Sequence, residues 1–129
     1  MRESAMVIHG HHQIIDYSIG TPTEVEFNFM RIWEFMRKNW DGLLHFYHVH
    51  PSGMPDISTK DINCMNGLRC ALGIDFFFSV VTYKTDNLFD IEHNCTIYLK
   101  KKKEHTLLYG APVLTSAQAL FLKYLAYGG

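Results

Sequence analysis

Two histidines and a carboxylate in one short stretch carry the strongest chemical signal of this sequence. His48 and His50 stand two residues apart, so on an extended strand their imidazoles leave the same face and can share one metal ion. Asp61 can supply a third ligand if residues 51–57, which contain prolines and a glycine, turn back and Asp61 opens the following helix. Two histidines and one carboxylate leave a coordination position open for water, as catalytic zinc sites do.

Ser58 and Asp61 also have an interpretation that needs no metal. A serine followed three residues later by an acidic side chain is the form of a helix capping box. The His48 and His50 pair could likewise be ordinary hydrogen-bonded imidazoles. The joint occurrence of the pair with Asp61 favours a zinc site, and the cap can coexist with it because a helix start would fix the orientation of the carboxylate.

Length and composition restrict the class of protein. A chain of 129 residues predicts one domain with a single core. The hydrophobic content of 47%, the charged content of 19% and the net charge of -1 describe a folded protein and give no reason to expect nucleic acid as a partner. Apolar runs such as 76–78 are far below the ~20 residues of a membrane-spanning helix, so no membrane partner is expected either.

The cysteines indicate the compartment. Their number is odd and no C-x-x-C spacing occurs, which argues against a disulfide framework and favours a reducing compartment, the cytoplasm. We interpret all three as small buried hydrophobic residues: Cys64, Cys70 and Cys95.

Hydrophobic periodicity predicts strands and helices in alternation along the chain, which is an α/β domain. We expect strands at 4–9, 13–19, 43–49, 76–83, 88–92, 95–99 and 106–109, and helices at about 24–38, at about 59–72 and from Thr115. The strand at 43–49 is apolar on both faces, as in a sheet covered on both sides. Capping pairs are expected at Thr23 with Glu26, Ser58 with Asp61, and Thr115 with Gln118.

Each predicted helix has an apolar packing face. The faces consist, in chain order, of Phe29, Ile32, Trp33 and Met36; of Ile62, Met65, Leu68 and Leu72; and of Leu120, Phe121, Tyr124 and Leu125.

The spacing His48-x-His50, seven residues, Ser58, two residues, Asp61 resembles the motif of the JAMM (MPN+) zinc metalloproteases. The motif fixes four identities and three spacings, which makes chance agreement far rarer than for a lone glycine motif. The resemblance implies an MPN-like (cytidine-deaminase-like) fold over residues 1–129, with a mixed β-sheet flanked by helices and with Zn²⁺ on His48, His50 and Asp61.

The resemblance also implies a catalytic glutamate on an early strand. Glu3 is preferred over Glu24 and Glu26, because the latter two fall in the first turn of a predicted helix, where the helix dipole already explains them. The strand and helix that precede this glutamate in the family are absent from the sequence, so the position of Glu3 depends on the pairing of residues 4–9. Val49 also departs from the polar residue of many relatives.

The resemblance assigns the catalytic roles. Zinc would lower the pKa of bound water toward neutrality. Glu3 would take the proton of that water and pass it to the departing amine, and Ser58 would donate a hydrogen bond to the oxyanion.

The function implied is that of a zinc isopeptidase or peptidase that cleaves after the C-terminal Gly-Gly of ubiquitin-like or sulfur-carrier proteins. Two alternatives stay open: a catalytically inactive MPN scaffold or assembly module, and a zinc peptidase of cell-wall or phage-tail type. The chain itself ends in Gly128-Gly129, which we interpret as helix terminators rather than as the tail of a modifier. The sequence does not indicate an oligomeric state.

Overall fold

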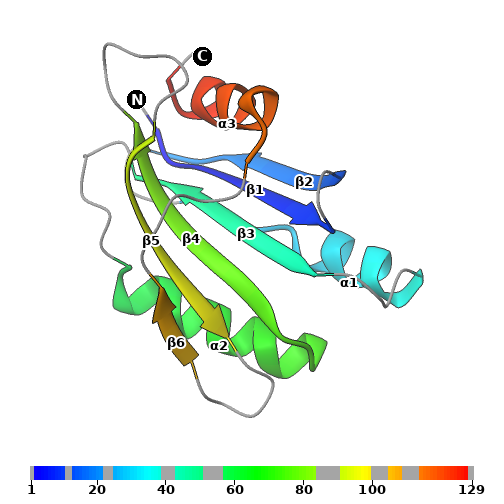
Figure 1. Cartoon of the computed structure of the whole chain (residues 1–129). Helices are drawn as coiled ribbons and strands as arrows, with labels where there is room; N and C mark the ends of the chain where they lie inside the picture. The colour runs from blue at the N-terminus through cyan, green and yellow to red at the C-terminus, as the bar shows by residue number, and fades with distance from the viewer. Residues whose placement is uncertain are drawn as a thin grey trace.

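The structure, a computed structural model, describes residues 2–10, 13–21, 25–38, 43–50, 57–83, 91–99, 105–108 and 114–127. These residues form one mixed sheet and three helices (Figure 1), which confirms the α/β class. In chain order the elements are β1 (Ser4–His9), β2 (Gln13–Ile19), α1 (Phe29–Lys38), β3 (Leu44–Val49), α2 (Thr59–Leu72), β4 (Phe76–Tyr83), β5 (Ile91–Leu99), β6 (His105–Leu108) and α3 (Ser116–Tyr127). Predictions at Thr23, Glu24, 51–56, 88–90, the Cys95 side chain and Gly128-Gly129 lie outside the described residues.

The six strands lie in the order β2-β1-β3-β4-β5-β6. Neighbouring strands are antiparallel except for β3 and β4, which are parallel and are connected through α2. In this register Ala5 of β1 and Val80 of β4 flank His48 of β3. The strand that carries His48 and leads to His50 is therefore internal, as its apolar character predicts.

Both faces of the sheet carry a core, so β3 is covered on both sides (Figure 1). On one face, α1 and α2 pack with Ile32, Met36, Met65 and Leu68 against side chains of the sheet such as Phe46. On the other face, α3 packs with Leu122 and Ala126 against Met6, Ile8, Tyr47 and Val49.

Helix α1 begins at Phe29, so its predicted start at about residue 24 is wrong. Asn28 caps the helix, because its Oδ1 accepts the N–H of Arg31 at 3.1 Å. Asp16 of β2 holds this start from outside the helix: its Oδ2 accepts the Asn28 N–H at 3.3 Å and its Oδ1 contacts Arg31 Nη1 at 3.2 Å. Glu26 precedes the helix and cannot form the capping box expected for it.

The packing faces of α1 and α3 differ in part from the prediction. In α1, Ile32 and Met36 are buried, whereas Phe29 and Trp33 are exposed. The capping pair of α3 is confirmed, since the Thr115 and Gln118 side chains each accept the other's backbone N–H. Its predicted face is wrong at Leu120 and Tyr124, which are exposed; the side chains that α3 buries include Ala119, Leu122, Leu125 and Ala126.

Helix α2 agrees with the prediction at both ends. It spans Thr59–Leu72, with Ser58 as its N-cap and with Gly73 in the left-handed conformation at its C-terminal end (φ 64°). Its buried side chains include Met65, Leu68 and Leu72 of the predicted face. The strands predicted at 88–92 and 95–99 were wrongly separated, because residues 91–99 form the single strand β5.

Two other expectations concern membrane insertion and the cysteines. In the part of the chain that the structure describes, no helix is both long and apolar enough to span a membrane. Cys64 is half-buried, but Cys70 is exposed, so its interpretation as a buried residue is wrong.

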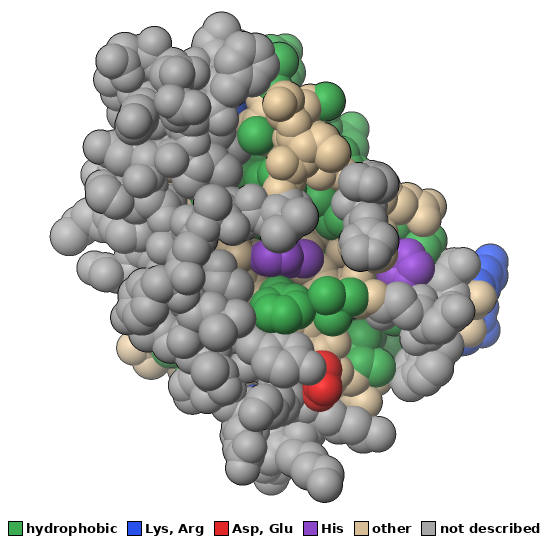
Figure 2. All heavy atoms as spheres, viewed as in Figure 1, with side chains coloured by type: hydrophobic (Ala, Val, Ile, Leu, Met, Phe, Trp, Pro, Cys, Tyr) green, Lys and Arg blue, Asp and Glu red, His purple; other side chains and the backbone are tan. Residues whose placement is uncertain are grey.

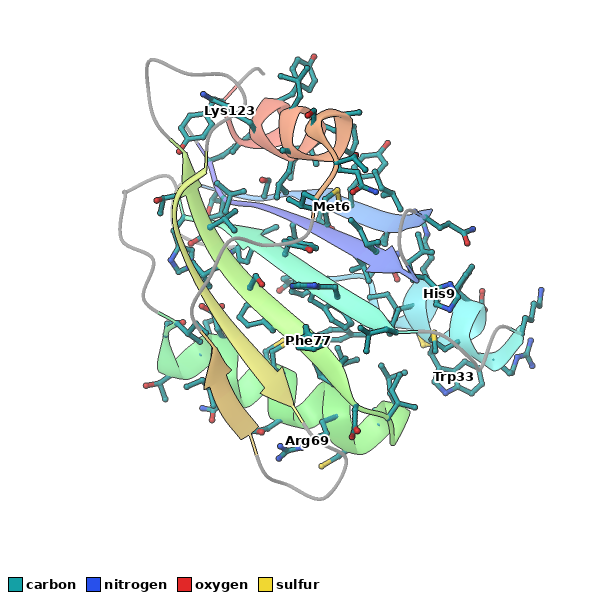
Figure 3. All side chains as sticks on the ribbon, in the orientation of Figure 1. Met6, His9, Trp33, Arg69, Phe77 and Lys123 are labelled. Atoms are coloured by element: carbon teal, nitrogen blue, oxygen red, sulfur yellow. The ribbon has the colours of Figure 1, made fainter. Side chains whose placement is uncertain are left out.

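A histidine network lies on the α3 face of the sheet, away from His48. His45 Nε2 lies 2.7 Å from Ser79 Oγ, and His45 Nδ1 lies 3.0 Å from Tyr47 Oη. Phe77, labelled in Figure 3, packs beside His45 with ring centroids 5.4 Å apart, and Figure 2 shows histidine and hydrophobic side chains side by side on this face. Burial lowers the pKa of His45 to about 3, so the ring is neutral near pH 7.

The first prediction is that His45 makes the fold sensitive to acid. In the unfolded chain a histidine binds a proton below pH ~6.5, whereas folded His45 does so only at about pH 3. Between these values the unfolded state binds more protons, so stability decreases as the pH decreases, by at most about 1.4 kcal/mol per pH unit from this group. Urea unfolding at pH 7.5, 6.5, 5.5 and 4.5 should show a shallower acid loss in His45→Gln than in wild type. Parallel pH profiles would contradict the prediction.

Candidate metal centre

The five side chains predicted for the site lie around one cavity of about 410 Å³. The cavity is at the carboxyl end of β3, beside the first turn of α2. Glu3, His48, His50, Ser58 and Asp61 all line it. Residues that are up to 58 positions apart in the sequence are therefore brought together by the sheet register and by the position of α2.

Glu3 is held firmly although it precedes the first strand. Its N–H donates to Thr21 O at 2.8 Å, and its carbonyl oxygen accepts the N–H of Gly20 at 2.9 Å. The preceding residue, Arg2, donates its N–H to Ala126 O of α3 at 3.1 Å. These bonds extend the anchoring of the strand beyond residues 4–9, and only 8% of Glu3 is exposed.

His48 lies between the two carboxylates. Its Nε2 lies 3.1 Å from Glu3 Oε2, and its Nδ1 lies 3.3 Å from Asp61 Oδ1. The ring is buried, with 4% of the residue exposed. Burial alone would lower the pKa of His48, but the contacts with Asp61 and Glu3 outweigh burial and raise the pKa to about 9.

His50 faces the same two carboxylates from the end of β3. Its Nε2 lies 3.6 Å from Asp61 Oδ2 and 3.7 Å from Glu3 Oε1. The rings of His50 and His48 are nearly perpendicular, at 82°, with centroids 4.7 Å apart. The backbone N–H of His50 donates to Val81 O at 3.1 Å, which fixes the strand end against β4.

Asp61 and Ser58 form the capping box that the sequence predicts. The Asp61 N–H donates to Ser58 Oγ at 3.1 Å, and the Ser58 N–H donates to Asp61 Oδ2 at 3.3 Å. Burial of Asp61 opposes ionisation, but its contacts with His48, His50 and Ser58 prevail and hold its pKa well below the usual value. The cap and the contacts with both histidines coexist, so the two interpretations of this pair are compatible.

Two ligands of a tetrahedral ion at 2.0–2.1 Å lie about 3.4 Å from each other. The Glu3 carboxylate fits this spacing, because its oxygens lie 3.1 Å from His48 Nε2 and 3.7 Å from His50 Nε2. Asp61 lies at similar separations, 3.3 Å from His48 and 3.6 Å from His50, but it faces Nδ1 of His48 rather than Nε2.

Among the described residues, Glu3, His48 and His50 offer ligand atoms that all lie within 4.8 Å of one another and could hold a metal ion. The sequence predicts Asp61, rather than Glu3, as the third metal ligand beside His48 and His50. Glu3 contacts His48 at Nε2, whereas Asp61 contacts it at Nδ1. The two carboxylates therefore reach His48 from opposite sides of the ring.

An apolar wall of the same cavity was not predicted from the sequence. Val25, Phe27 and Phe29 form it from the segment that leads into α1, and Cys64 and Met65 form it from α2. Two charged residues of the same segments, Glu26 and Lys60, also line the cavity. A helix from residue 24 would have placed Val25 and Phe27 within its first turn. Asn28, a strong N-cap residue, was the signal that could have moved the predicted start to its correct place.

Comparison with models of protein families gives no match, and comparison with curated protein sequences gives none either.

The second prediction is that zinc stabilises the fold through His48. A ligand at a concentration one hundred times its Kd adds about 2.7 kcal/mol to the free energy of unfolding, which corresponds to about 10 °C in Tm for a domain of this size. Thermal unfolding followed by circular dichroism, after treatment with a chelator and with or without added zinc, should show this rise in wild type. His48→Ala should show little or none. An equal rise of the Tm in both proteins would show that zinc binds at another site.

Proposed function

We propose that the chain is a zinc-dependent peptidase of the JAMM type, with an MPN-like fold, that hydrolyses an amide bond in the cavity beside His48. The observation that carries the proposal is the convergence of Glu3, His48, His50, Ser58 and Asp61 on one cavity. The last four of these residues have the order and spacing of the JAMM motif, and Glu3 is the early acidic residue that the motif requires.

His48, His50 and Asp61 are the residues that would hold zinc. A bound zinc ion would lower the pKa of a water molecule toward neutrality and would polarise the substrate carbonyl. The histidines must bind as neutral rings, and a carboxylate near a histidine orients its ring and raises its basicity. With Asp61 as a ligand, the carboxylate that would orient the His48 ring is that of Glu3, on the Nε2 side of the ring.

Glu3 would act as the proton carrier. Its carboxylate lies 3.1 Å from His48 Nε2 and 3.7 Å from His50 Nε2, so it would be near a water molecule on an ion that His50 binds. A general base there accepts the proton of the water and returns it to the nitrogen of the departing amine.

Ser58 would stabilise the oxyanion. Its hydroxyl oxygen accepts the Asp61 N–H at 3.1 Å, and a hydroxyl that accepts such a bond still has its own hydrogen to donate. Ser58 lines the cavity, so that hydrogen can be directed to a substrate oxygen. One such donor typically stabilises the transition state by about 3 kcal/mol.

The substrate would be the C-terminal Gly-Gly of a ubiquitin-like or sulfur-carrier protein. Glycine has no side chain, so an extended Gly-Gly segment can bring its carbonyl close to a buried site. His48 and Glu3 are buried at the cavity wall, which requires such a close approach.

The third prediction separates the roles of the two carboxylates. Asp61→Asn should lose bound zinc, because a ligand is lost, whereas Glu3→Gln should retain zinc and lose a factor of about 10²–10⁴ in kcat with a ubiquitin-like fusion. Metal content by elemental analysis and cleavage by gel electrophoresis are the two measurements.

Wild type is the reference for both measurements. The reverse pattern, with zinc lost in Glu3→Gln and retained in Asp61→Asn, would make Glu3 the third ligand and would overturn this assignment. A folded wild type that binds no zinc would refute the proposed function.

The fourth prediction concerns Ser58. Ser58→Ala should lower kcat about 100-fold, because the oxyanion donor is lost, and should also cost about 1 kcal/mol of stability, because the cap is lost. Ser58→Thr keeps a hydroxyl for both tasks and should remain within about tenfold of wild type. The assay must be run well below the Tm of each variant. A Ser58→Ala protein that is less stable but fully active would limit Ser58 to capping.

A further inference from the structure

The metal centre shares its cavity with an apolar wall that the proposed chemistry does not use. Val25, Phe27 and Phe29 form this wall together with Cys64 and Met65. Val25 and Phe27 are half-buried, and Phe29 is 41% exposed, so the wall runs from the core to an accessible ring.

A row of aromatic rings connects this wall to His48. The centroids of His48 and Phe78 are 6.2 Å apart, those of Phe78 and Phe27 are 6.4 Å apart, and Phe29 stacks beyond Phe27 at 6.4 Å. Phe27 is fixed in this row by an edge contact with buried Phe46 at 5.2 Å. Phe27 and Phe29 also line the same cavity as His48, so a ligand against the wall shares that cavity with the reacting centre.

The wall is formed in advance by polar contacts outside the cavity. Asp16, which is 3% exposed, accepts the N–H of Asn28 at 3.3 Å, and Asn28 caps α1 directly after Phe27. The residues on either side of Asn28 are thereby held without a ligand. A pre-formed surface loses less conformational entropy when a ligand binds.

The cavity is larger than the Gly-Gly segment of a substrate requires. One water molecule occupies about 30 Å³, and cavities that hold small-molecule ligands span about 300–1,000 Å³. The volume here is about 410 Å³, and Gly-Gly contributes no side chain to it. The cavity therefore has room for a side chain that Gly-Gly does not supply, and its apolar wall suits an apolar one.

We propose, on the basis of the peptidase function above, that this wall receives a large apolar side chain of the residue that supplies the departing amine. The substrate class is a linear chain in which Gly-Gly is followed by a residue such as Phe or Leu. Hydrolysis adds one water across the amide C–N bond, releases the glycine carboxylate, and frees the amine of the apolar residue. Phe27 and Phe29 then determine specificity on the amine side.

A binding experiment, the fifth prediction, tests the wall without catalysis. Phe-Gly-Gly-amide and Gly-Gly-Gly-amide mimic the amine product and are titrated into zinc-loaded protein by calorimetry. Wild type should bind the Phe peptide at least about tenfold more tightly, because apolar surface is covered. Phe29→Ala should reduce this ratio to under about threefold. Met30→Ala is the matched control: Met30 is 68% exposed on the same helical turn and is not among the described residues that line the cavity, so the ratio should persist.

Cleavage of two fusions then separates this inference from the proposed function. The fusions differ only in the residue after Gly-Gly, which is Phe or Gly. A preference for Phe in kcat/KM supports the inference, and equal cleavage of both fusions with equal peptide binding overturns it while the peptidase function stands. If neither fusion is cleaved but the Phe peptide binds more tightly, the peptidase function fails and the apolar site remains. Circular dichroism confirms that each variant is folded.

Discussion

Two carboxylates against one buried imidazole are the constraint on which the rest of the site depends. Buried Glu3 and half-buried Asp61 both contact His48, and a buried carboxylate without a positive partner costs several kcal/mol. These contacts therefore favour a positive charge among the three side chains, which a proton on His48 or a bound cation can supply. Because metal ligands bind in deprotonated form, a cation would replace that proton rather than add to it. The contacts that raise the pKa of His48 are thus also contacts that could hold an ion.

The sheet topology explains why this cluster forms at one place. β3 and β4 are parallel, so the chain must cross over between them, and it does so through α2. The carboxyl end of β3 then lies next to the start of α2. Open α/β sheets bind their ligands at such a position, outside the carboxyl ends of the strands. β1 pairs with the other edge of β3 and brings Glu3 to the same end. Three elements meet there, and each contributes a part of the site.

The accuracy of the sequence predictions followed the range of the interactions that decide each feature. The ends of α2 were predicted because Ser58 and Gly73 act locally. The start of α1 was not, because Thr23 with Glu26 competed with Asn28 as a local capping signal and because Asp16, twelve residues before Asn28, helps to hold the start at Asn28. The buried face of α3 was misassigned because this helix is apolar on several sides, and the sheet beneath it decides which side is buried.

In the site too, features that depend on local sequence were predicted and features that depend on long-range contacts were not. The spacing of the motif was sufficient to predict that His48, His50, Ser58 and Asp61 belong together. The approach of Glu3 to His48 depends on the register of β1 against β3, which no local pattern reveals. The aromatic wall depends on contacts between Phe27 and the sheet, and it was missed for the same reason.

The way in which each carboxylate is held supports different roles for the two. Asp61 is short, its backbone begins a helix, and its Oδ2 accepts the Ser58 N–H while both oxygens contact histidines. Such a group has little freedom, and an ion needs ligands that are fixed before it binds. Glu3 has a longer side chain, and its backbone is fixed by Thr21 and Gly20. Because the backbone of Glu3 is fixed, its carboxylate can remain near the reacting water. Because its side chain is longer, the carboxylate can then reach the departing nitrogen, which is the movement that a proton carrier requires.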